Sequence, residues 1–299
     1  DNGETILVDT NAILDIPIRH HIEKLNPVGS TSNPDRFVLN LIFDPLVIPN
    51  PFNYTDPASD IPWLLSEEPT WSVISEDLSM WILRLRDDIV FFDGNKLDAA
   101  DVKFTLDFLK WVEPEYHSWM DIPNIYINTT IVDNTTIKVY LQTAGYLMAR
   151  RILDIIVFPR HIYEKAETWG GTSGIFPEWD VTRAMVKEYI PQSPEDPILV
   201  GYGPFKISGW SEGKEVFESE MFILERNSNY FMRAVDEDGN IIYEWRKLTL
   251  ESIRSLGAEA FRGPYVEHVN IHVVDNTCLL YTSDAADDGE SVDLGGRRI

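Results

Sequence analysis

Apolar and more polar positions alternate from residue 81 to residue 86, in the sequence W-I-L-R-L-R. This period of two predicts a strand with one face in the core and one wetter face. After Asp87 and Asp88, residues 89–92 form a continuous apolar run, which predicts a second, buried strand. The pattern is typical of a structural unit in an α/β domain.

A turn and a capped helix follow these two predicted strands. Asp93 and Gly94 form a turn pair, because glycine accepts a positive φ without steric cost. Asp98 stands where a helix N-cap belongs, and Asp101 adds negative charge to the first turn. The helix that begins at Ala99 carries two apolar stripes, which predicts burial from two sides. The stripes are Val102, Leu106 and Leu109, and Phe104, Phe108 and Trp111.

The rest of the chain continues to mix helical and strand patterns. Residues 125–132 and 136–141 flank Asp133-Asn134 and predict a β-hairpin. Residues 144–166 predict a helical region broken at Pro159, and the proline-rich residues 191–197 predict a stiff crossover between subdomains. In the run V-G-Y-G-P-F that begins at Val200, the glycines permit a tight backbone path before another strand.

Composition narrows the functional classes. The 299 residues carry a formal net charge of −24 and are 44% hydrophobic, enough for a sizeable core in one or two domains. Such acidity argues against nucleic acid or anionic lipid as a partner, because phosphate binding requires a basic surface. Cys278 is the only cysteine, so an internal disulfide and a cysteine-based metal site are excluded. The sequence has no apolar run of membrane-spanning length.

Several residues could suggest chemistry, and each has a simpler interpretation. Glu113 and Glu115 resemble the acid pair of a glycosidase, but two acids in a polar loop are usually solvated. His161 is expected to form structural hydrogen bonds, and Trp71 is expected in the core. His268 and His272 lie about 13 Å apart on a predicted strand, too far to share one metal ion. The sequence therefore predicts no catalytic residue, no metal site and no cofactor.

Three motifs in order resemble one known family. They are L-R-D-D-I-V-F-F-D-G-N-K-L-D-A-A-D-V from Leu85, V-G-Y-G-P-F from Val200, and L-E-R-N-S-N-Y-F from Leu224. The chain is thereby similar to the family 5 extracellular solute-binding proteins of ABC importers, which include dipeptide, oligopeptide and nickel receptors. It departs from the family pattern at Asp88, Phe92 and Asp98, where glycine, histidine and threonine are usual.

The resemblance implies an α/β fold of the periplasmic-binding-protein type II class, with only the first lobe present. Residues 1–46 and 195–276 are expected to form a base subdomain with a mixed sheet, and residues 47–194 an inserted α+β subdomain. Residues 277–299 lack periodicity and resemble translated adapter sequence, so we expect them to be non-native or disordered. A second lobe, absent from this chain, is expected to complete the cleft, leaving apolar surface exposed on the first.

The same resemblance implies which residues line the ligand cleft. A polar loop after Leu25-Asn26-Pro27 is expected to reach it, as is the segment that follows Trp111. The expected ligand-binding residues are Thr31, Ser32, Asn33, Tyr116, Trp119, Tyr202 and Gly203.

The function implied is capture of an extracellular solute, with an oligopeptide expected, and its delivery to ABC permease subunits in the membrane. A monomer is expected outside the cytoplasm, at the cell surface or in the periplasm, tethered by an N-terminal segment outside this chain. Two alternatives from other classes stay open. One is a secreted carbohydrate-active hydrolase, and the other is a cell-surface structural or adhesion module.

Overall fold

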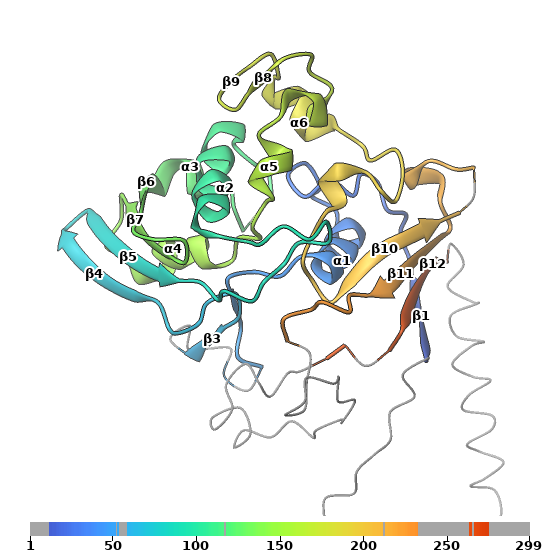
Figure 1. The fold of residues 1–299 in the computed structure, drawn as a ribbon, viewed down its shortest axis with the longest axis horizontal. Helices are drawn as coiled ribbons and strands as arrows, with labels where there is room; N and C mark the ends of the chain where they lie inside the picture. Colours follow the sequence, from blue (N-terminus) through green and yellow to red (C-terminus); the bar gives the residue numbers. More distant parts are fainter. Residues whose placement is uncertain are drawn as a thin grey trace, which may run out of the picture.

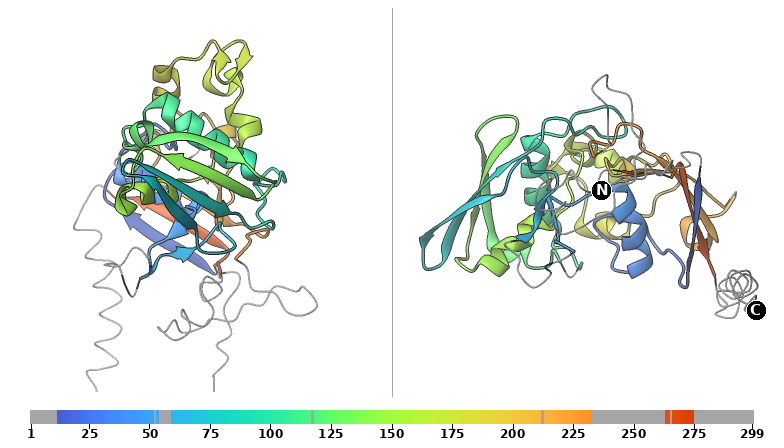
Figure 2. Two further views of the ribbon diagram at one scale, coloured as in Figure 1. Left: turned by 90° about the vertical axis from the view of Figure 1, so that its left-hand side faces the viewer. Right: turned by 90° about the horizontal axis from the view of Figure 1, so that it is seen from below.

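The computed structural model describes residues 12–51, 53, 59–116, 118–211, 213–232, 263–264 and 266–274. Two four-stranded sheets lie at opposite sides of the molecule, with helices between them (Figures 1 and 2). The structure is therefore of the α/β class, as the resemblance implies.

The base sheet joins the two ends of the described chain. Strand β1 (Ile13–Ile18) pairs in parallel with β12 (His268–Val273), so that Ile13 lies opposite His268. Strands β11 (Met221–Arg226) and β10 (Phe205–Trp210) continue the sheet in antiparallel order. Helix α1 (Asn33–Ile42) packs beside β10 (Figure 1).

The second sheet belongs to the middle of the chain. Its strand order is β4 (Thr70–Ser75), β5 (Leu78–Arg84), β7 (Thr136–Leu141) and β6 (Tyr126–Ile131), all antiparallel. Helix α2 (Ala99–Val112) packs against β6 and β7 (Figure 2). Residues Trp81 and Leu83 of β5 are buried while Arg84 is exposed, which confirms the alternation predicted for this strand.

Short elements complete the fold. The two-residue strands are β2 (Val47–Ile48), β3 (Ile61–Pro62), β8 (Gly174–Ile175) and β9 (Glu178–Trp179). The short α-helices are α3 (Ile122–Ile125), α4 (Tyr146–Ala149), α5 (Arg160–Tyr163) and α6 (Arg183–Glu188). The 3-10 helices are η2 (Arg150–Leu153), η3 (Ala166–Trp169), η4 (Pro197–Leu199) and η5 (Val216–Glu218).

One hydrophobic core connects both sheets. Trp81 of the second sheet and Ile271 of the base sheet belong to the same cluster of buried residues. Phe108 of α2 is at its aromatic centre, with ring contacts to Phe104, Trp111, Phe158, Tyr163, Trp169, Phe176 and Trp179. Both apolar stripes of α2 therefore pack into this core, as their spacing predicts, with Trp111 half-buried at its edge. The two expected subdomains share a core, and their boundaries stay a prediction.

The local signals around α2 are confirmed in detail. Asp98 accepts hydrogen bonds from the N–H groups of Ala100 and Asp101, and the Asp101 carboxylate accepts one from the Asp98 N–H. This reciprocal capping box satisfies donors that the first turn cannot use. Gly94 has a φ of +90°, and its N–H donates to the carbonyl of Phe91 at 2.9 Å. The predicted turn and N-cap therefore determine where α2 begins.

Two local predictions are wrong. Residues 89–92 form no strand, because their backbone pairs with residues 95–97 across the turn and with Gly201, not with a sheet. Trp71 is not a core residue, since 42% of its surface is exposed. It lies on strand β4, and no described strand pairs with the outer edge of β4. Its ring stacks on Trp81, with 5.6 Å between the ring centroids.

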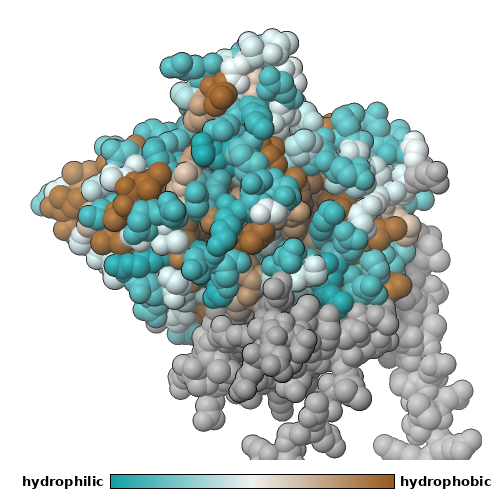
Figure 3. Space-filling view, in the orientation of Figure 1, coloured by the Kyte–Doolittle hydropathy of each residue, from teal (hydrophilic) through white to brown (hydrophobic). Residues whose placement is uncertain are grey.

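The face seen in Figure 3 is mostly hydrophilic, with hydrophobic side chains gathered over β4 and β5. The exposed apolar residues of β4 are Trp71, Val73 and Ile74. Whether apolar surface marks the packing site of a second lobe stays a prediction. Residues 277–299, expected to be non-native, lie outside the described residues.

Candidate functional site

The polar loop before α1 is held in place by Asn26. Its amide nitrogen donates to the carbonyls of Val186 and Tyr189 at 2.7 and 2.9 Å, and its side-chain oxygen accepts from the N–H groups of Val28 and Gly29. Asn26 is fully buried, so these four bonds satisfy an amide that water cannot reach. The loop is thereby fixed against α6.

Gly29 allows this loop to lie directly on the backbone of α6. A Cβ atom added at Gly29 would lie 2.0 Å from the carbonyl oxygen of Lys187, which no side chain tolerates. Three ion pairs hold α6 to its neighbours: Lys24–Glu188 at 2.8 Å joins it to this loop, and Arg183–Glu113 at 2.6 Å and Lys187–Glu115 at 3.3 Å join it to the segment after α2. Such pairs contribute little stability, but they neutralise the acids of this region. Glu113 and Glu115 are thus surface ion-pair partners.

The predicted residues Thr31, Ser32 and Asn33 lie together at the N-terminal end of α1. Ser32 is the N-cap, and its hydroxyl accepts a hydrogen bond from the Asp35 N–H at 3.3 Å. Thr31 and Asn33 are exposed, and Ser32 is half-buried. The helix dipole makes such an end weakly positive. The three side chains therefore form a polar, accessible surface.

Arg36 lies one turn further along α1 and is buried, with 7% of its surface exposed. Its Nε and Nη2 atoms donate to the carbonyl of Ser30 at 3.0 and 2.6 Å. The guanidinium carbon lies 3.7 Å from the ring centroid of Tyr116 and 4.8 Å from that of Trp119. Removal from water lowers the pKa of Arg36 to about 10, which leaves the group protonated at neutral pH.

The predicted aromatic residues differ in what they can reach. Tyr116 is half-buried and packs edge-on to Trp119, with ring centroids 5.1 Å apart. Trp119 is 1% exposed, and its indole N–H donates to the carbonyl of Asp154 at 3.1 Å. Tyr116 therefore keeps surface for a ligand, whereas Trp119 supports Tyr116 and Arg36 from inside.

Tyr202 and Gly203 lie at the other end of α1. The backbone N–H groups of both residues donate to the carbonyl of Ile42, the last residue of the helix. The Tyr202 hydroxyl donates to the carbonyl of Asp44 at 2.6 Å and accepts from the Val157 N–H at 2.8 Å. A helix of 10 residues is about 15 Å long, so these two residues are remote from Thr31. Both are buried, with no side-chain surface for a ligand.

Asp44 adds a buried acid to this second end. Its carboxylate accepts a hydrogen bond from the Tyr230 hydroxyl at 2.8 Å. Burial raises the pKa of Asp44 to about 7, despite the stabilising hydrogen bond from Tyr230. The predicted site residues thus divide into an open end of α1, where Thr31, Ser32, Asn33 and Tyr116 gather, and a sealed end with Tyr202 and Gly203.

Sequence reasoning missed Arg36, Asn26 and Asp44. A signal for Arg36 was present, because it lies three residues before Leu39 and therefore falls on the buried stripe of α1. A charged residue at such a position predicts a special environment. Asn26 and Asp44 carry no comparable signal, since their partners lie far away in the sequence.

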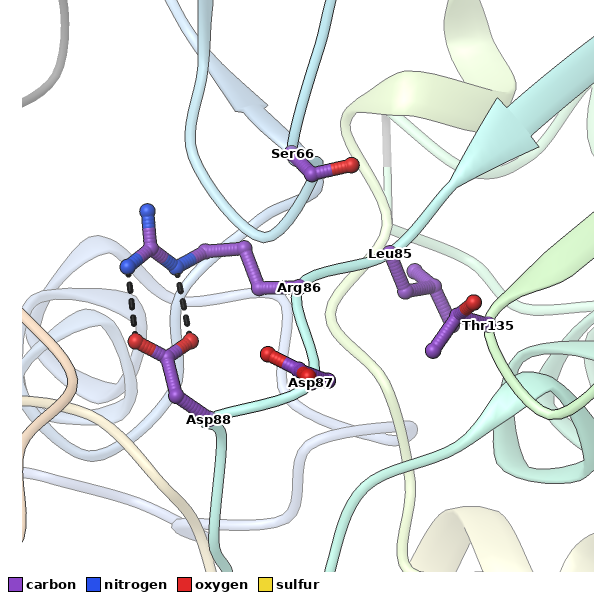
Figure 4. A pocket seen from close by; sticks show the side chains of 6 residues that line it. All are labelled: Ser66, Leu85, Arg86, Asp87, Asp88 and Thr135. Carbon is purple, nitrogen blue, oxygen red and sulfur yellow. Dashed lines mark hydrogen bonds and ion pairs between the residues drawn. The ribbon is translucent and has the colours of Figure 1, made fainter.

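Two cavities lie away from the open end of α1. One, of about 410 Å³, is lined by Ser66, Leu85, Arg86, Asp87, Asp88 and Thr135 (Figure 4). Its Arg86 forms a two-pronged ion pair with Asp88, at 2.9 and 2.7 Å, so the charge is already neutralised. The other, of about 140 Å³, lies beside Trp71 and Tyr146.

Within the described ranges, no group of three or more His, Cys, Asp or Glu side chains is arranged to hold a metal ion. His161 forms a hydrogen-bonded pair with Asp93 at 2.5 Å, which agrees with the structural role expected for it. In the same part of the chain, no helix combines the length and the apolar character required to cross a membrane.

Known proteins resemble this chain in sequence and in fold. The nickel-binding periplasmic protein of Escherichia coli is 28% identical over 130 residues, which is 42% of this chain and 22% of that protein. The oligopeptide-binding protein AppA of Bacillus subtilis, solved with a nonapeptide, superposes with a TM-score of 0.62 at 16% identity, covering 94% of this chain and 44% of AppA. NikA of Brucella suis, solved with Fe(III)-EDTA, gives a TM-score of 0.56 at 19% identity, covering 92% of this chain and 42% of NikA.

These coverages show that the chain spans less than half the length of the proteins it matches. The superpositions establish that the chain shares the fold of these binding proteins, and at such low identities they establish the fold alone. A family model for bacterial extracellular solute-binding proteins, family 5 Middle, matches residues 61–287. This match includes the first part of residues 277–299, so the expected non-native origin of that segment stays a prediction. Since the match covers most of the sequence, the chain belongs to the family 5 bacterial extracellular solute-binding proteins.

Proposed function

We propose that this chain forms one lobe of the substrate-binding component of an ABC importer. The observation that carries the proposal is the family match over residues 61–287. The open end of α1 supports it, because Thr31, Asn33 and Tyr116 offer accessible polar and aromatic surface on a rigid support. A rigid support suits binding, since fixed side chains lose less entropy when a ligand arrives.

The mechanism we propose is closure of two lobes around a solute, followed by docking on a membrane permease. The described lobe supplies the open end of α1, and a second lobe supplies the opposite wall. Thr31, Ser32, Asn33 and Tyr116 contact the solute directly. Trp119, Tyr202 and Gly203, also expected as ligand residues, act by holding the lobe in shape, because they are buried.

We propose a peptide as the solute. The relatives named above are associated with a nonapeptide, with nickel and with Fe(III)-EDTA, so the family accommodates different ligands. The described residues provide no cluster of metal ligands, which favours a solute held by hydrogen bonds and aromatic contacts. We place the protein outside the cytoplasm, as a tethered monomer that captures its solute without chemical change.

A hydrolase receives no support from the described geometry. Glu113 and Glu115 each face a basic residue of α6, and both carboxylates are exposed on the surface, outside any enclosed site suited to proton transfer. The relatives are binding proteins.

A thermal-shift screen of the full-length protein tests the proposal, with peptides, sugars and metal chelates as separate panels. A peptide at 100 times its Kd is expected to stabilise the fold by about 2.7 kcal/mol. Tyr116→Ala is expected to reduce the shift, whereas Tyr140→Ala, on the outer face of β7, is the matched control. The absence of a shift with every solute would count against a receptor role.

A further inference from the structure

Arg36 is a buried charge that forms no ion pair with any described carboxylate. Buried arginines are normally paired, because an unpaired charge inside a protein is costly. Among the described residues, no carboxylate forms an ion pair with its guanidinium. The neighbouring Asp35 attracts the charge of Arg36 without forming an ion pair with it, and its carboxylate accepts from the N–H groups of Glu23 and Lys24 at 2.7 and 3.3 Å.

Only part of the guanidinium is occupied by the protein. Nε and Nη2 donate to the Ser30 carbonyl, and the flat faces of the group meet the rings of Tyr116 and Trp119. Nη1 donates to no acceptor in the described part of the chain. Nη1 is not sealed off within the described structure, so this edge of the guanidinium keeps contact with solvent. Arg36 therefore presents donors in a fixed orientation.

The surroundings favour a negatively charged group at this edge. The nearby acids Glu113, Glu115 and Glu188 are each paired with a basic residue of the same region. The N-terminal end of α1 adds the positive end of its dipole. A charge of −24 on the chain repels anions in general, so an anion needs a local positive site of this kind.

We propose that Arg36 and the N-terminal end of α1 bind a carboxylate group of the captured solute. The inference rests on the proposed solute-binding function and assigns the part of the site that holds a carboxylate of the solute. Nη1 donates to the carboxylate, Thr31 and Asn33 complete its shell, and Tyr116 and Trp119 keep the guanidinium in one orientation. Planar guanidinium groups suit this task because their donors match the spacing of carboxylate oxygens.

The test uses two probes of equal shape, glutarate and its neutral diamide, glutaramide. Each is titrated into the complete 299-residue chain at constant ionic strength, and the side-chain nitrogen signals of ¹⁵N-labelled arginine are followed by NMR. We expect glutarate to shift the Arg36 signal and glutaramide to leave it in place. A positioning role for Arg36 alone predicts no difference between the two probes.

Variants assign the effect to Arg36. Arg36→Gln is expected to weaken glutarate binding by about 10- to 100-fold, because a charge-assisted hydrogen bond is lost. Arg36→Lys, which keeps the charge and lowers the risk of misfolding, is expected to retain part of the affinity. Arg86→Gln is the matched control, since Arg86 is paired with Asp88 in another cavity.

Three outcomes would overturn the inference. They are equal responses to glutarate and glutaramide, no response of the Arg36 signal to glutarate, and unchanged glutarate affinity in a folded Arg36→Gln or Arg36→Lys variant. The proposed receptor function survives each of these if the solute screen still finds a stabilising ligand. If the screen finds none while glutarate binds at Arg36, the receptor proposal fails and the anion site stands.

Discussion

The two ends of α1 differ in the surroundings that they give to a buried ionisable group. At the open end, Arg36 keeps its charge beside aromatic rings and an accessible polar loop. At the sealed end, Asp44 is enclosed by Tyr230 and Tyr202, and its pKa rises to about 7. Removal from water acts on both groups, lowering the pKa of the arginine and raising that of the acid.

This contrast shows which residues of the family pattern form accessible binding surface and which ones support the fold. Tyr202 and Gly203 belong to a motif that identifies the family, yet they close the fold around the last turn of α1. Thr31 and Tyr116 lie in less distinctive sequence and keep accessible surface. A family motif can therefore mark the support of a site without marking its ligand contacts.

The largest expected effect comes from a substitution of Gly203, at the sealed end of α1. A Cβ atom there would lie 2.6 Å from the carbonyl carbon and 2.8 Å from the backbone nitrogen of the adjoining residues Ile42 and Phe43. Because backbone atoms cannot rotate away, Gly203→Ala should lower the free energy of unfolding by more than about 4 kcal/mol. Urea denaturation followed by circular dichroism measures this loss.

Gly209→Ala is the control for Gly203→Ala, because its nearest neighbour is a flexible side-chain atom at 4.0 Å. It should change stability by less than about 1 kcal/mol. If Gly203→Ala folds normally and loses only solute binding, Gly203 is a ligand residue and the distinction between the two ends fails.

The second largest effect concerns the pH dependence at Asp44. Its pKa is raised from an ordinary 3.8 to about 7, so the folded state binds this proton more tightly than the unfolded state does. The contribution of Asp44 protonation to the free energy of unfolding is fully present below pH 3.8 and is lost as the pH rises towards 7. Asp44→Asn stays neutral, so its free energy of unfolding should rise relative to that of the wild type by up to about 4 kcal/mol across this pH range.

Unfolding free energies of wild type and Asp44→Asn, measured at several pH values from 4 to 8, reveal this gain as a widening difference. Asp87→Asn, in an exposed loop, tests whether a change of one charge reproduces it. Parallel curves for Asp44→Asn and the wild type would show that Asp44 is ionised at little cost.

Local signals predicted the elements near α2 well. Asp98, Gly94 and the hairpin of residues 126–141 depend on partners within a few positions, which a pattern reveals directly. Residues 89–92 were misassigned because their apolar run is compatible with any buried extended segment. Their actual partners include Gly201, more than a hundred positions away.

The candidate site was predicted only in part, for a physical reason. The structure brings the loop and the aromatic segment together, since Arg36 joins Ser30 to Tyr116, and their place in a ligand cleft stays a prediction. The resemblance did not reveal that Trp119 and Tyr202 face inward, because an aromatic residue suits a core and a binding surface equally. Likewise, Trp71 on an edge strand is exposed for reasons of topology that periodicity does not contain.

A smaller effect compares hydroxyl groups at the two ends. Tyr202→Phe removes the acceptor of the buried Val157 N–H and a donor to Asp44, so stability should fall by about 1–3 kcal/mol. Tyr116→Phe should cost less than about 0.5 kcal/mol, because its hydroxyl makes no hydrogen bond with the described residues. Chemical denaturation of both variants measures the contrast, and equal losses would contradict it.

The smallest expected effect separates capping from binding at Ser32. Ser32→Ala removes the side-chain acceptor for the Asp35 N–H and should cost about 1 kcal/mol, whereas Thr31→Ala, at an exposed position, should be nearly neutral. Ser32→Asn should restore the cap, since asparagine is an equally good N-cap residue. If Ser32→Asn regains stability but binds the screened solute more weakly than wild type, the hydroxyl contacts the solute as well as the helix. If binding returns together with stability, Ser32 acts only by ordering the open end of α1, and the solute contacts reduce to Thr31, Asn33 and Tyr116.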